Sequence, residues 1–173
     1  MKIREDIIEW AVDSSPDSPS VFWLSGQAGS GNMTIAYTIT QYFDRLVKVK
    51  NPNPHTVFGG SFFCLHQFEE MREWICILPT LIYQLAKKSR SYAHALHKAD
   101  KLDSYDKLSE QMEDLLSDPW QKSEAQHHEL PPYLVIIDVL DEIEGQEGSM
   151  FLGDLLKAID GCYLRGIKFF VMS

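Results

Sequence analysis

Cysteine is scarce in this 173-residue sequence, and its three copies follow no pairing pattern. Cys64, Cys76 and Cys162 show no CxxC or metal-type spacing, which argues against a disulfide framework and against a zinc site. Cys64 and Cys76 lie among apolar residues, so we expect buried, reduced thiols there. This usage is typical of a reducing compartment, and we predict a cytoplasmic protein.

Long apolar runs and a surplus of basic residues are also absent. No run approaches the roughly 18 apolar residues of a membrane-spanning helix, and the charged first residues do not fit a secretory signal. The formal net charge of -9 argues against nucleic acid or an anionic membrane as the main partner. The hydrophobic fraction of 45% suffices for the core of one domain.

Histidine-based metal binding and serine-based catalysis are not indicated either. His127 and His128 stand in a polar stretch without partner cysteines or a third histidine at useful spacing. Ser25 and Ser173 have no paired base. The glycine-rich and acidic segments are therefore the remaining candidates for a functional site.

Apolar runs of strand type alternate along the chain with stretches of helical spacing. The expected strands are 21–24, 57–65, 133–137 and 167–172. The expected helices lie within 3–12, 35–47, 69–100, 105–116 and 151–159, and the polar residues 117–131 are expected to form a loop. Because the strand-type runs are apolar at successive positions, both sheet faces should be covered. The prediction is an α/β fold with a parallel sheet and helices on both faces.

A glycine-rich segment follows the first apolar run. Its residues, which together would form a phosphate-binding site, are Gly26, Gln27, Ala28, Gly29, Ser30, Gly31, Asn32, Met33 and Thr34. Its place between a strand and a helix and its glycine spacing match the Walker A loop G-x-x-x-x-G-K-[ST]. Such a loop binds phosphate through inward-pointing backbone N–H groups and the positive end of the following helix. A plain tight turn is the alternative interpretation.

An acidic motif of Walker B type follows the third apolar run, where Ile137 leads into Asp138. A strand end places Asp138 at the carboxyl edge of the sheet, where a carboxylate can bind Mg²⁺ through water. Glu142 could orient or deprotonate the attacking water, and Asp141 could share either role. The alternative is an acidic loop that caps the next helix.

Several blocks, in the same order, resemble the NACHT domains of fungal signalling proteins. The blocks are Val21–Gly31 with Thr34–Ala36, Ser61–Cys64, Leu78–Ala86, Ile137–Glu142 and Lys168–Ser173, so the resemblance covers nearly the whole chain. These domains belong to the STAND class of P-loop NTPases, which includes NLR-like proteins. The resemblance implies a three-layer P-loop fold, with an N-terminal helix and linker over 1–20 and a core over 21–173. It implies a core that is incomplete at its C-terminal end, truncated after the fourth strand.

The same resemblance implies ATP or GTP with Mg²⁺ as ligand, and other domains of a longer signalling chain as partners. The sequence departs from the family at the phosphate loop, where Asn32 replaces the lysine and Met33 replaces the serine. Each lost charge-assisted bond is worth about 1.5–3 kcal/mol, so we expect weak nucleotide binding or none, and impaired hydrolysis. A non-catalytic protein-interaction module on the same scaffold is the main alternative. A small kinase is a further one, against which the acidic block argues.

The resemblance also predicts how the strands are arranged. The strand 167–172 should lie between 21–24 and 133–137, with 57–65 at the far side. Asp138 and Glu142 should then lie near residues 29–34. The outer edge of 21–24 would be open, so we expect the isolated chain to self-associate.

Overall fold

The computed structural model describes residues 2–26, 31–48, 55–63, 76–99, 107–123, 131–138 and 147–172. Four strands form one parallel sheet, in the order β1-β4-β3-β2. They are β1 (Val21–Leu24), β2 (Val57–Phe63), β3 (Tyr133–Asp138) and β4 (Ile167–Met172). The predicted strand order is confirmed. Cys64 and Leu65, predicted to extend the second strand, lie outside the described residues.

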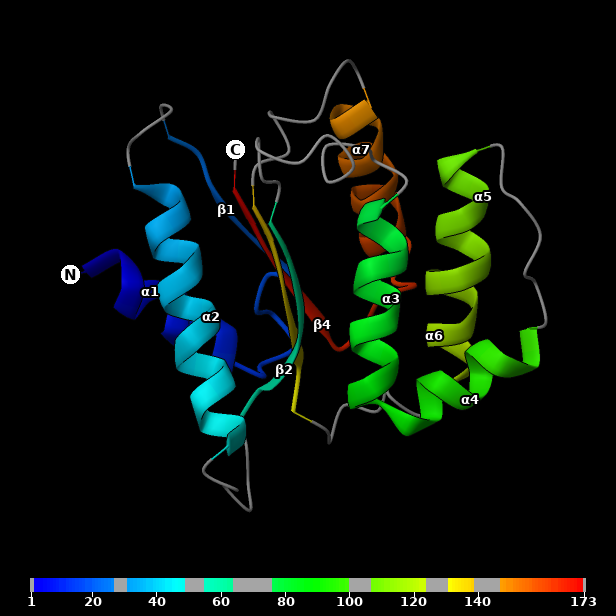
Figure 1. Ribbon diagram of the computed structural model, residues 1–173, viewed down its shortest axis with the longest axis horizontal. Coiled ribbons are helices and arrows are strands. Elements are labelled where there is room, and N and C mark those ends of the chain that lie inside the picture. Colours follow the sequence, from blue (N-terminus) through cyan, green and yellow to red (C-terminus); the bar gives the residue numbers. More distant parts are fainter. Residues whose placement is uncertain are drawn as a thin grey trace.

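Helices cover both faces of the sheet (Figure 1). On one face lie α1 (Lys2–Val12) and α2 (Asn32–Lys48). On the other side lie α3 (Ile77–Lys88), α4 (Arg90–Ala99), α5 (Leu108–Met112), the π-helical turn η3 (Glu113–Ser117), α6 (Asp118–Lys122) and α7 (Glu147–Asp160). This arrangement confirms the predicted α/β class, with a parallel sheet between two helical layers.

The two faces of each inner strand build two separate cores. Side chains alternate between the faces of a strand, and both faces of β3 and β4 are buried. The core on the side of α1 and α2 contains Ile7, Trp10, Ile39, Phe43, Leu134, Ile136, Phe170 and Met172. The opposite core contains Leu81, Leu85, Trp120, Val135, Ile137, Phe151, Phe169 and Val171. Burial on both sides explains why these strands read as uninterrupted apolar runs.

The loop predicted over 117–131 is wrong for its first residues, because the helical run continues through η3 and α6 to Lys122. Trp120 is fully buried, its ring centroid lies 5.4 Å from that of Tyr92 and 5.3 Å from that of Tyr133, and its Nε1 donates to the Arg165 carbonyl at 2.8 Å. One large aromatic anchor therefore holds an otherwise polar helix on the core. Pro119 lies at the start of α6, directly after the π-helical turn η3. Residues 124–130 lie outside the described residues.

The remaining differences from the predictions are small. The helix α7 begins at Glu147, four residues before the predicted start at Phe151. Cys76 is half-buried rather than buried, and Cys162 is exposed; both are free thiols. Cys64 lies outside the described residues.

The two edges of the sheet are protected differently. Along β2, the side chain of Gln84 pairs with the backbone of Ser61: Oε1 accepts from the Ser61 N–H at 2.8 Å, and Nε2 donates to its carbonyl at 2.9 Å. Gly60 makes this approach possible, because an added Cβ would lie 2.8 Å from the Cβ of Gln84. Along β1, no described strand pairs with the outer edge, and Trp23 is 44% exposed. Among the described residues, β1 is therefore an edge strand without a neighbouring strand on its outer side, and it directly precedes the glycine-rich segment.

Candidate functional site

The glycine-rich segment joins the carboxyl end of β1 to the amino end of α2 (Figure 1). β1 ends at Leu24, and α2 begins at Asn32. Gly31 has a φ of +90°, a left-handed conformation that favours glycine. Its carbonyl accepts the N–H of Ile35 at 3.1 Å, so it begins the hydrogen-bond ladder of the helix. Gln27, Ala28, Gly29 and Ser30 lie outside the described residues, whereas Gly26 lies within them.

The first turn of α2 contains the remaining residues of the predicted loop. The first N–H groups of a helix have no intrahelical acceptor, and they carry the positive end of its dipole. Met33 is 44% exposed, Thr34 is exposed and Asn32 is half-buried. Thr34 uses its carbonyl to accept the hydroxyl of Thr38 at 2.7 Å. This turn therefore offers backbone donors and accessible side chains, but no lysine.

Asp138 is the last residue of β3 and is only 1% exposed. It follows Leu134 and Ile136 in the alternation of β3, and these two residues pack in the core on the side of α2. Asp138 therefore belongs to the face that α2 covers. A buried carboxylate is costly unless it is hydrogen-bonded or binds a cation.

The strand register places the ends of β1 and β3 at one edge of the sheet. Leu24 is level with Met172, and Ile137 is level with Val171. Since β4 lies between β1 and β3, the backbones at these ends are roughly 10 Å apart, two strand spacings. Asp141 and Glu142 lie outside the described residues, so their proximity to the loop stays a prediction.

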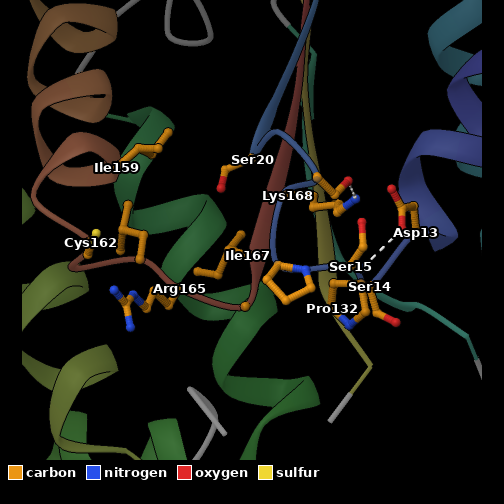
Figure 2. A pocket seen from close by; sticks show the side chains of 14 residues that line it. Asp13, Ser14, Ser15, Ser20, Pro132, Ile159, Cys162, Arg165, Ile167 and Lys168 are labelled. Carbon is orange, nitrogen blue, oxygen red and sulfur yellow. Dashed lines mark hydrogen bonds between the residues drawn. The ribbon is translucent and has the colours of Figure 1, made fainter. Parts of the chain in front are cut away.

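A cavity of about 380 Å³ opens at the opposite, amino edge of the sheet (Figure 2). Lys168, 6% exposed, lies beside it, and its Nζ donates to the Trp10 carbonyl at 2.5 Å and to the Ser18 Oγ at 2.7 Å. Burial lowers the pKa of Lys168, and the nearby charge of Asp13 opposes this shift. This cluster was not predicted from the sequence, where a single lysine within the apolar run 167–172 was the available signal.

Neither a metal centre nor a membrane span is present among the described residues. They contain no cluster of three or more histidine, cysteine, aspartate or glutamate side chains that could bind a metal ion. None of their helices is long and apolar enough to cross a membrane. His127 and His128 lie outside the described residues.

The sheet order and the strand–loop–helix junction define an α/β protein with a P-loop-like three-layer fold. The model of the family described as nephrocystin 3, N-terminal, matches residues 3–173. The chain belongs to this family. No curated protein and no solved structure gives a significant match to the chain. The matched family is not the NACHT type itself, so the NACHT relationship stays a prediction.

Proposed function

We propose that the chain is the nucleotide-binding core of a STAND-class signalling NTPase related to the NACHT type, with a weakened phosphate loop. The conformation of Gly31 is the main support, because a left-handed glycine stands where the backbone leaves β1 and enters α2. Such a junction turns backbone N–H groups towards an anion. The proposed ligand is ATP or GTP with Mg²⁺, held by residues 26–34.

Asp138 is the proposed Mg²⁺ residue. It is buried at the carboxyl edge of the sheet and belongs to the face that α2 covers. In open α/β sheets, ligands collect at this edge. Glu142, with Asp141, is proposed to position the attacking water. These roles are carried over from the resemblance.

The side chains at the start of α2 argue for weak binding. Asn32 can donate a hydrogen bond to a phosphate oxygen, but it is neutral and shorter than lysine. Met33 offers a thioether, which is a poor ligand for the hard Mg²⁺ ion. Hydrolysis should suffer more than binding, because phosphoryl transfer depends on positioning and on charge neutralisation.

Titration with a fluorescent nucleotide, in competition with ATP and GTP, tests this proposal. We expect measurable binding with little dependence on Mg²⁺. The variant Gly31→Val is the control, because a β-branched residue at a φ of +90° is strained. Its added Cβ meets no atom within 4 Å, so crowding does not confound the result. Equal binding by both proteins would contradict a role for this junction.

A non-catalytic interaction module is the second candidate. It is favoured by the open outer edge of β1 and by exposed aromatic residues near it in sequence, Trp23 at 44% and Tyr37 at 57% exposure. Such an edge could pair with another domain or with a second copy of the chain. A failure of nucleotide binding even in the double variant Asn32→Lys with Met33→Ser would favour this candidate.

A further inference from the structure

The linker between α1 and β1 contains two serines that are each followed directly by proline, Ser15-Pro16 and Ser18-Pro19. Proline immediately after the acceptor is the sequence that proline-directed protein kinases select. The linker forms a tight turn, in which the Ser18 N–H donates to the Ser15 carbonyl at 3.0 Å. Pro16 occupies the second position of this turn, where proline is favoured. Both dipeptides are therefore presented outside regular secondary structure.

Only one of the two serines is bonded to a buried cation. The Ser18 Oγ accepts a hydrogen bond from the Lys168 Nζ at 2.7 Å, and Lys168 is 6% exposed. Both residues line the cavity of about 380 Å³. Lys168 is labelled in the view of this cavity in Figure 2. A group added to the Ser18 Oγ therefore has both free volume and a positively charged partner. Ser15 instead uses its backbone N–H to donate to the Asp13 carboxylate at 3.0 Å.

We propose that Ser18 is a phosphorylation site for a proline-directed serine kinase, and that its phosphate binds Lys168. The kinase transfers the γ-phosphoryl group of ATP to Oγ. The bond between the γ-phosphorus and its bridging oxygen breaks, an Oγ–P bond forms, the hydroxyl proton passes to the catalytic base of the kinase, and ADP leaves.

The phosphate changes the partners of Lys168. It carries about −1.5 to −2 charges at pH 7, and its oxygens accept strong charge-assisted hydrogen bonds. At present the nearby charge that favours the ammonium form of Lys168 is the exposed carboxylate of Asp13. After phosphorylation, the phosphate inside the cavity is the negative charge that favours the ammonium form of Lys168. The negative charge of the phosphate also repels the carboxylate of Asp13, which is exposed.

The ion pair between phosphorylated Ser18 and Lys168 connects the linker to the central sheet. Lys168 belongs to β4, and its Nζ also donates to the Trp10 carbonyl at the end of α1. Ser20, two residues beyond Ser18, begins the pairing of β1 with β4, because its carbonyl accepts the Phe169 N–H at 2.8 Å. Phosphorylation therefore strengthens the junction of α1, β1 and β4 at the amino edge of the sheet.

The site is tested with the full chain, prepared unmodified and incubated with a proline-directed kinase and ATP. We expect tandem mass spectrometry to locate phosphate on Ser18. Ser18→Ala and Pro19→Ala should abolish it, whereas the matched variants Ser15→Ala and Pro16→Ala should retain it. Pro19→Ala preserves the carbonyl of residue 19, which accepts the Trp10 Nε1 at 2.7 Å. Phosphate on Ser15 alone, or none on the folded chain, would overturn the proposal.

The contact with Lys168 has its own readouts. Phosphorylation should raise the Tm of the chain by about 2–4 °C, and Lys168→Met should remove this rise. A second readout needs no variant at Lys168: the second pKa of the phosphate, followed by ³¹P NMR, should be lower in the folded chain than in a phosphopeptide of residues 13–20. An unchanged Tm together with a peptide-like titration would refute the pairing.

Discussion

Restoring two side chains at the start of α2 should recover nucleotide binding. The change is the double substitution Asn32→Lys with Met33→Ser, which rebuilds the phosphate lysine and the Mg²⁺ hydroxyl. Met33 is 44% exposed and Asn32 is half-buried, so neither substitution opens a cavity in the core. A lysine at a helix amino end costs about 0.3–1 kcal/mol of folding free energy. The fold should therefore tolerate both changes.

The expected gain follows from the two contacts. Each charge-assisted hydrogen bond contributes about 1.5–3 kcal/mol, so the pair should contribute about 3–6 kcal/mol to binding. This corresponds to a Kd lower by a factor of about 10² to 10⁴. The part that depends on the new hydroxyl at position 33 acts through Mg²⁺, so the full gain should appear only when Mg²⁺ is present.

Calorimetric titration with ATP and with GTP, each with and without Mg²⁺, measures this gain. Asn32→Gln is the matched control, because it lengthens the side chain without adding charge and should leave the Kd nearly unchanged. Adding Asp138→Asn to the repaired chain should remove the Mg²⁺-dependent part alone. Equal affinities before and after repair would show that the backbone cradle is lost as well, and the interaction module would then be the better explanation.

Three further predictions concern stability and association. Gln84→Ala should lower the free energy of unfolding by about 1–3 kcal/mol, because it removes both hydrogen-bond partners of the Ser61 backbone. Urea denaturation measures this, and an unchanged free energy would show that Gln84 does not stabilise the β2 edge. Burial lowers the pKa of Lys168 below its ordinary 10.5, so just below pH 10.5 the unfolded chain binds more protons than the folded chain. The free energy of unfolding, measured from about pH 8 to 10.5, should therefore contain a contribution that rises with pH. Lys168→Met should abolish this contribution. The open edge of β1 should cause self-association that Trp23→Lys reduces, and a monodisperse monomer of the unaltered chain in light scattering at high concentration would contradict this.

The sequence by itself predicted the features that depend on residues close together in the chain, namely the strands and the turn before α2. The four apolar runs predicted the strands, because strands buried on both faces need apolar side chains at successive positions. The glycine spacing placed a turn before α2, and Gly31 has the left-handed φ that such a turn requires. The order of the strands came from the family resemblance and not from these local patterns.

Contacts between residues far apart in sequence were decided only by the tertiary structure. Trp120 converts a polar stretch into a buried helix, because its partners Tyr92, Tyr133 and Arg165 come from three other segments. Lys168 is accommodated in an apolar strand because the Trp10 carbonyl and Ser18 hydroxyl, 158 and 150 residues away, accept its hydrogen bonds. Hydrophobic periodicity in a sequence indicates which face of a helix or strand is buried, but it does not indicate which polar groups contact one another on that face.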